Sequence, residues 1–291
     1  MPHYVWQRGQ VGEQRSSGAV ASILHSSFCF GAIVSIAAFL LLDSEVSRGV
    51  DAGWLALVLG QGVWISVFAS LLLLNPSFLE TLDGRPLGRL GWPNQLTLSR
   101  IYLLPLMLAL ILRAHFGEAL VLYAVLASTD VADGILARRS DGATKLGFVL
   151  DPLADILFNL GIFSALSLAG ALPWWVGALV ILRYGILLVG CAVLYGWKGE
   201  IWIRPTFFGK ATGFLVALLT TGLFVLLAMG GTQGALSHWT GRSIGVLVAI
   251  GVFHVVVMGW INIRRPNQGG TAVYRRSFGL LVGRNPAPRG P

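Results

Sequence analysis

Long apolar stretches dominate this sequence and restrict the class of protein that it can form. Of its 291 residues, 55% are hydrophobic and only 12% are charged, which does not suit a soluble domain. About eight stretches have the roughly 20 residues that a helix needs to cross a bilayer. They run approximately over residues 19–42, 53–74, 97–116, 118–138, 146–169, 172–195, 211–230 and 243–263. The sequence therefore predicts an all-α, polytopic membrane protein.

Three parts follow one another along the chain. Residues 1–90 hold two predicted spans and the polar connection NPSFLETLDGRPLGRLGWPN, whose Gly, Pro and Arg content marks the expected domain boundary. Residues 91–265 hold six spans joined by short connections, which is typical of antiparallel neighbouring helices. Residues 266–291 are basic and are expected to form a flexible cytoplasmic tail. The predicted fold is thus a six-helix bundle preceded by two extra transmembrane helices.

The formal net charge of +8 is concentrated at the ends of the predicted spans. If eight spans alternate from a cytoplasmic start, most basic residues fall on one side, which the positive-inside rule identifies as the cytoplasmic face of the cell membrane. Both termini and the polar stretch between the fourth and fifth spans are then cytoplasmic. Basic loops attract anionic headgroups, so membrane lipids are the expected partners and nucleic acid is not.

Four aspartates interrupt the fourth and fifth predicted spans at helical spacing. Asp130 and Asp133 are three residues apart, and Asp151 and Asp155 are four apart, so each pair shares one helix face. A short polar connection, RSDGATK, lets the two pairs face each other across a helical hairpin. An isolated carboxylate at the bilayer centre costs about 2.5–3.5 kcal/mol on insertion scales. A cation is therefore expected to offset this cluster.

Oxygen ligands alone favour hard cations such as Mg²⁺ or Mn²⁺, and four carboxylates suffice for two bridged ions. Two metal ions beside Arg138 would suit phosphoryl transfer. An alternative is that the aspartates cap helices or pair with Arg139 and Lys145, although this suits single aspartates better than all four. A transporter is the alternative from another class, but its acids would be spread over several spans. A non-catalytic scaffold would be free to lose an aspartate, and none is missing.

The stretch from Asp130 to Asp155 has the pattern D-x2-D-G-x2-A-R-x8-G-x3-D-x3-D. This pattern resembles the signature of the CDP-alcohol phosphatidyltransferase family at every defined position. The segment PNQLTLSRIYLLP, from Pro93 to Pro105, is similar to the start of that family's first core helix. The resemblance covers residues 91–265, so the chemistry is expected to survive removal of residues 1–85, at lower stability.

The resemblance implies a role for each aspartate. Asp130 and Asp151 would bridge both metal ions, and Asp133 would bind one of them. Asp155 would bind the other ion and act as the general base. The reaction implied is transfer of a phosphatidyl group from CDP-diacylglycerol to an alcohol, with release of CMP and with two Mg²⁺ or Mn²⁺ ions as cofactors.

Further residues are expected at the CDP-linked substrate. The resemblance places Gly134, Arg138 and Thr144 there, and Ala137 and Gly147 fill the small positions of the pattern. Small residues let a nucleotide approach the helix, and an arginine offers a forked donor to a phosphate; close helix packing is the alternative explanation for the small residues. Asn94 and Thr97, one turn apart, are interpreted either as nucleotide-binding residues or as helix caps.

The acceptor is expected to meet basic residues. Arg183 lies near the middle of a predicted span, where a charge faces the bundle interior or pairs with an acid. Arg204 and Lys210 belong to RPTFFGK, which resembles a connection in phosphatidylglycerophosphate and cardiolipin synthases, although plain positive-inside residues would look the same. Those synthases often carry lysine after the fourth aspartate, where this chain has Ile156. Glycerol 3-phosphate is the preferred acceptor; phosphatidylglycerol, inositol phosphate and other alcohols stay open, as does a homodimer.

Overall fold

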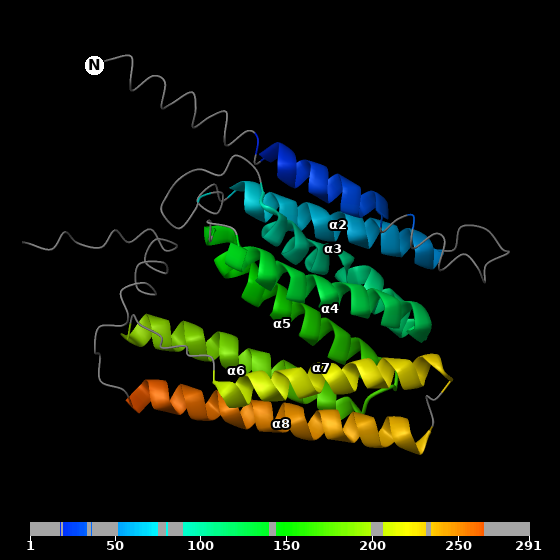
Figure 1. Cartoon of the computed structure of the whole chain (residues 1–291), viewed down its shortest axis with the longest axis vertical. Helices are drawn as coiled ribbons and strands as arrows, with labels where there is room; N and C mark the ends of the chain where they lie inside the picture. Colours follow the sequence, from blue (N-terminus) through cyan, green and yellow to red (C-terminus); the bar gives the residue numbers. More distant parts are fainter. Residues whose placement is uncertain are drawn as a thin grey trace, which may run out of the picture. The chain divides into compact units, whose positions relative to one another are not determined.

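The structure is a computed structural model, and it describes most of the hydrophobic part of the chain. The described ranges are 20–33, 52–74, 90–139, 144–198, 206–230 and 234–264, with the single residues 18, 36 and 80. Within these ranges the side chains of residues 52–55, 129–139, 148, 195 and 198 are not described. Every secondary-structure element longer than one residue in the described ranges is a helix, which confirms the predicted all-α class (Figure 1).

The helices correspond one by one to the predicted spans. They are Val20–Ile33, α2 Ala52–Leu74, α3 Trp92–Leu112, α4 Phe116–Arg139, α5 Lys145–Leu168, α6 Trp174–Lys198, α7 Phe207–Ala228 and α8 Ala235–Arg264. Among the described residues, α2, α3, α5, α6, α7 and α8 are long and apolar enough to cross a membrane. Val20–Ile33 and Phe116–Ser128 are apolar over shorter lengths. The chain is therefore a multi-pass membrane protein.

Several helices begin earlier than the apolar stretches predict. α3 starts at Trp92 and α8 at Ala235, where the expected starts were near residues 97 and 243. Hydropathy detects only the apolar part of a helix, and the first turns of both helices contain polar side chains such as Asn94 and His238. In α3, Pro93 suits the first turn because the N–H that it lacks has no helical partner there. The added turn of α3 carries Asn94, one of the predicted site residues.

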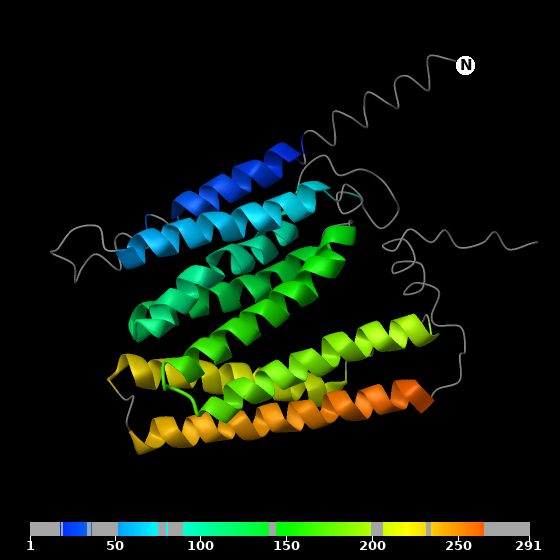
Figure 2. The same ribbon diagram turned by 180° about the vertical axis from the view of Figure 1, so that it is seen from behind.

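The chain divides into two compact units. The first unit comprises residues 1–109 and 122–158, and the second comprises residues 110–121 and 159–291. In the first unit, Val20–Ile33, α2, α3 and the beginning of α5 contribute to one apolar core (Figure 2). Its buried members are Ile23, Ile65, Phe68, Ala69, Leu72, Leu90, Leu98, Ile101, Tyr102, Leu146, Leu150 and Ala154. The two N-terminal helices therefore share a core with α3 and with the beginning of α5, which carries Asp151 and Asp155.

In the second unit, α8 packs against both α6 and α7. Glycines allow the close approach of α6 and α8. A Cβ added at Gly245 would lie 2.1 Å from the Trp175 ring, and one added at Gly241 would lie 3.1 Å from Leu172. Small residues at such crossings are how membrane helices gain van der Waals contact, because lipid supplies no hydrophobic driving force between helices.

Candidate functional site

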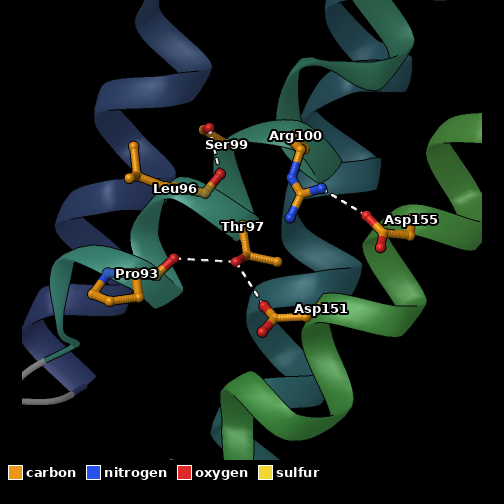
Figure 3. Close-up of polar contacts among 7 residues, drawn as sticks. All are labelled: Pro93, Leu96, Thr97, Ser99, Arg100, Asp151 and Asp155. Atoms are coloured by element: carbon orange, nitrogen blue, oxygen red, sulfur yellow. Dashed lines mark hydrogen bonds and ion pairs between the residues drawn. The ribbon is translucent and has the colours of Figure 1, made fainter. Parts of the chain in front are cut away.

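Two side chains of α3 hold the two aspartates of α5 (Figure 3). The Thr97 hydroxyl donates to Asp151 Oδ1 at 2.8 Å and lies 3.1 Å from the Pro93 carbonyl oxygen. Since a hydroxyl carries a single proton, the shorter bond to the charged carboxylate is favoured. Arg100 Nη1 lies 2.6 Å from Asp155 Oδ1 in an ion pair. Thr97 and Arg100 lie three residues apart on one face of α3, and they thus reach Asp151 and Asp155, which lie four residues apart on one face of α5.

Arg100 is a site residue to which the sequence analysis assigned no role, although it is part of the segment PNQLTLSRIYLLP. Its side chain is 5% exposed, whereas that of Asp155 is 57% exposed. A buried guanidinium is costly unless a carboxylate offsets it, so Arg100 fixes the direction of Asp155. The available signal was a cation near the beginning of a predicted span, one turn after Thr97, because charges in spans face a partner or a polar cavity.

A second polar contact joins the beginnings of α3 and α5. Thr144 precedes α5 and accepts a hydrogen bond from the Gly147 N–H at 3.0 Å, which is the geometry of a helix N-cap. The same hydroxyl donates to Asn94 Oδ1 at 3.1 Å. Asn94 is buried, with 4% of its surface exposed. Three of the predicted substrate residues therefore lie together, beside Asp151.

Gly147 is needed at this point because of space. A Cβ at this position would lie 2.9 Å from Asn94 Oδ1 and 3.2 Å from Thr144 Oγ1. We expect Gly147→Ala to separate α3 from α5 and to lower turnover by about ten- to a hundredfold, since a displacement of about 1 Å can cost that much. Turnover of the purified variant checks this. Gly190→Ala on α6 is the matched control, because nothing lies within 4 Å of its added Cβ; equal activity of the two variants would contradict the packing argument.

Glu80, from the connection that precedes α3, is fixed to the first residue of α5. Lys145 Nζ lies 2.6 Å from Glu80 Oε2, and the Lys145 N–H donates to the Glu80 carbonyl oxygen at 3.1 Å. The Lys145 side chain is 8% exposed. Lys145 thus pairs with a glutamate; pairing with the aspartates was the alternative considered from the sequence.

The other two aspartates lie on α4. Its helical backbone, Phe116–Arg139, includes Asp130, Asp133, Gly134, Ala137 and Arg138, so Asp130, Asp133 and Ala137 occupy one helix face. The side chains of these five residues are outside the described part. Among the side chains that are described, no group of three or more His, Cys, Asp or Glu is placed to hold a metal ion. The complete four-carboxylate cluster therefore stays a prediction.

The predicted acceptor residues belong to the second unit. The Arg183 guanidinium on α6 contacts α8 at Gly251, where an added Cβ would lie 3.1 Å from Arg183 Cζ, and it lies 5.7 Å from the centre of the Tyr184 ring. Among the described residues, no carboxylate lies within ion-pair distance of Arg183. Lys210 is exposed near the start of α7, which Thr206 caps. Arg204 is outside the described residues.

Comparison with known proteins identifies the family of this chain. Residues 90–260 match the family model described as CDP-alcohol phosphatidyltransferase. The chain belongs to this family. The match includes α3, α4 and α5 with the four aspartates of the motif, and it confirms the resemblance found in the sequence. No solved structure matches the chain.

Several CDP-alcohol phosphatidyltransferases are similar in sequence. A protein of Mycobacterium tuberculosis named "Probable phosphatidylglycerophosphate synthase" is 32% identical over 169 residues, which are 56% of this chain and 78% of the relative. A CDP-diacylglycerol–glycerol-3-phosphate 3-phosphatidyltransferase of Aquifex aeolicus is 35% identical over 138 residues, or 46% and 75% of the two chains. A cardiolipin synthase (CMP-forming) of Streptomyces coelicolor is 36% identical over 130 residues, or 42% and 59%. This chain also covers 62% of the length of a Mycobacterium tuberculosis relative whose name is that of a cardiolipin synthase.

The described part of the site fits the divalent metal ions expected for a CDP-alcohol phosphatidyltransferase. Asp151 and Asp155 present oxygen ligands from one face of α5, and both side chains are exposed. A hydroxyl and a guanidinium from α3 are among the groups that hold them, and the ligand atoms that they present are carboxylate oxygens. Such a donor set suits Mg²⁺ or Mn²⁺.

Proposed function

We propose that the protein is a phospholipid synthase of the cell membrane, which transfers a phosphatidyl group from CDP-diacylglycerol to an alcohol and releases CMP. The observation that carries this proposal is the arrangement of Asp151 and Asp155 on α5, held by Thr97 and Arg100, inside the family's motif. The positive-inside rule supports a cytoplasmic active site and cytoplasmic termini.

In this reaction the acceptor oxygen forms a bond to the lipid-linked phosphorus, and the bond from that phosphorus to CMP breaks. Two divalent ions held by Asp130, Asp133, Asp151 and Asp155 would neutralise the diphosphate. Asp155 accepts the proton of the acceptor hydroxyl, and Arg100 keeps its carboxylate in place. Arg138 binds a phosphate of the nucleotide, while Gly134 and Ala137 leave room for it.

The proposed acceptor is glycerol 3-phosphate. Two of the relatives carry names that specify glycerophosphate chemistry, and Arg183 is a cation that no carboxylate neutralises among the described residues. A pocket for a phosphorylated alcohol needs such charge. The cardiolipin synthase relatives support phosphatidylglycerol as the second candidate. Ile156 stands where both groups of synthases often carry lysine, which weakens the choice of glycerol 3-phosphate and leaves phosphatidylglycerol, inositol phosphate and other alcohols to be tested.

Replacement of Arg183 by Gln tests the acceptor. We expect the KM for glycerol 3-phosphate to rise about ten- to a hundredfold, because a hydrogen bond to a charged group contributes about 1.5–3 kcal/mol, while the KM for CDP-diacylglycerol changes little. The control is Arg242→Gln, at a residue of α8 whose guanidinium lies 5.4 Å from the centre of the Trp239 ring. Equal rises in both KM values would exclude Arg183 as an acceptor ligand.

Release of CMP tests the proposal as a whole. Purified protein in detergent is given labelled CDP-diacylglycerol, Mg²⁺ and a panel of alcohols that includes glycerol 3-phosphate, phosphatidylglycerol and inositol phosphate. A lipid product with glycerol 3-phosphate supports the full assignment. Product only with another alcohol corrects the acceptor, and no CMP with any alcohol would favour the transporter alternative.

A further inference from the structure

Pro105 interrupts the hydrogen bonding of α3 close to the site. Proline has no N–H, so the carbonyl oxygen four residues earlier, that of Ile101, loses its helical donor. Inside a membrane no water replaces it, and neighbouring helices have to satisfy the carbonyl. Ile101 directly follows Arg100, the residue that pairs with Asp155. The defect therefore lies one residue from a contact that orients the proposed general base.

α2 supplies the missing donor. Trp64 Nε1 donates to the Ile101 carbonyl oxygen at 2.8 Å. One residue further along α3, the Gln61 side-chain amide donates to the Tyr102 carbonyl oxygen. Gln61 is 2% exposed and lies one turn before Trp64 on α2. Two neighbouring carbonyls of α3 thus accept hydrogen bonds from side chains outside the segment that matches the family model, and one of them is the carbonyl that Pro105 leaves without a helical donor.

One further contact joins the helix Val20–Ile33 to the same part of α3, and a ring contact lies within α2. Ser27 Oγ lies 3.0 Å from the Tyr102 hydroxyl, and Tyr102 is fully buried. Phe68 packs on the Trp64 ring with 4.9 Å between ring centres. A helix that served only as a membrane anchor would not need to place a buried amide and a half-buried indole on backbone carbonyls of its neighbour.

We infer that Trp64, assisted by Gln61, is a positioning residue for catalysis. Trp64 bonds the Ile101 carbonyl that Pro105 leaves without a helical donor, and Gln61 bonds the next carbonyl, so that α3 is held where Thr97 and Arg100 reach Asp151 and Asp155. The inference rests on the proposed function, since the positioned residues are those of the transferase site. It replaces the expectation, drawn from the family boundary alone, that the chemistry survives without residues 1–85.

The test compares the effect of a Trp64 substitution in the presence and in the absence of Pro105. Pro105→Ala restores an N–H that can bond the Ile101 carbonyl, so it should remove the need for the Trp64 donor. We expect Trp64→Phe to lower kcat about tenfold in the natural Pro105 background, because a buried acceptor is left unsatisfied, with the KM for CDP-diacylglycerol nearly unchanged. In the Pro105→Ala background the same substitution should change kcat less than about twofold.

Phe68→Leu separates positioning from stability. Phe68 is 8% exposed and packs on Trp64, but it donates no hydrogen bond. We expect this variant to lower the thermal midpoint in detergent while kcat per folded molecule is retained, which is the opposite of Trp64→Phe. If Trp64→Phe lowers kcat equally in both backgrounds, or only in proportion to the loss of folded protein, the inference is overturned.

Hydrogen exchange keeps this test independent of the enzyme assay. Trp64→Phe should speed amide exchange in residues 97–106 of α3 and in the first half of α5, and Pro105→Ala should suppress this increase. Unchanged exchange in both segments would overturn the inference whatever the activity. Faster exchange, suppressed by Pro105→Ala, in a protein that releases no CMP would instead support the coupling of α2 to α3 and count against the proposed function.

Discussion

Asp151→Asn is expected to lower turnover by at least about a thousandfold, because loss of a carboxylate that is proposed to hold both metal ions would remove several kcal/mol of charge stabilisation. The amide is nearly isosteric, so Thr97 can still donate to its carbonyl oxygen and the contact between α3 and α5 is retained. The variant should therefore insert and fold while losing activity. Initial rates of CMP release, normalised to folded protein from size-exclusion chromatography, measure this loss.

Matched substitutions show whether the loss belongs to the cluster. Asp130→Asn, Asp133→Asn and Asp155→Asn should each resemble Asp151→Asn. The control is Glu118→Gln, which removes a carboxylate from the first turn of α4 whose neighbour is His115, at 3.8 Å. Substantial activity in two of the four aspartate variants would exclude the two-metal proposal.

Removal of divalent cations is the second change with a large expected effect. Exhaustive treatment with EDTA should abolish CMP release, because carboxylates alone cannot neutralise a diphosphate. Mg²⁺ or Mn²⁺ should restore the activity, and Zn²⁺ should restore it poorly, since it prefers nitrogen and sulfur ligands. The rate is measured before chelation, after it and after each metal is added at constant ionic strength. Activity that persists in EDTA would show that the aspartates serve another purpose.

The fold could be predicted from the sequence because a bilayer permits few structures. Each apolar stretch of about 20 residues has to satisfy its backbone internally, so hydropathy alone predicts helices. The helix ends could not be predicted in the same way. The polar first turn of α3, which includes Asn94, is stabilised by contacts such as the Thr144 hydrogen bond, and these depend on residues far away in the sequence.

The site was predictable where it depends on local spacing. Asp151 and Asp155 share one face of α5 because they are four residues apart, and the structure places both beside α3. The partners in α3 were harder to predict, since Arg100 and Asp155 are separated by 55 residues. No local rule connects Trp64 with Ile101, although a proline inside an apolar stretch signals a carbonyl that needs a donor.

The ion pair between Arg100 and Asp155 also bears on how the protein is made. α3 leaves the ribosome before α5, so a guanidinium is already in the nascent bundle when the acidic helix has to enter the membrane. The free energy of inserting a carboxylate into the membrane is lower when a guanidinium already lies beside it than when it is neutralised only later by a metal ion from solution. Arg100 thus gives the chain its own counter-charge for Asp155, which is available while the helix pair assembles and before any metal ion binds.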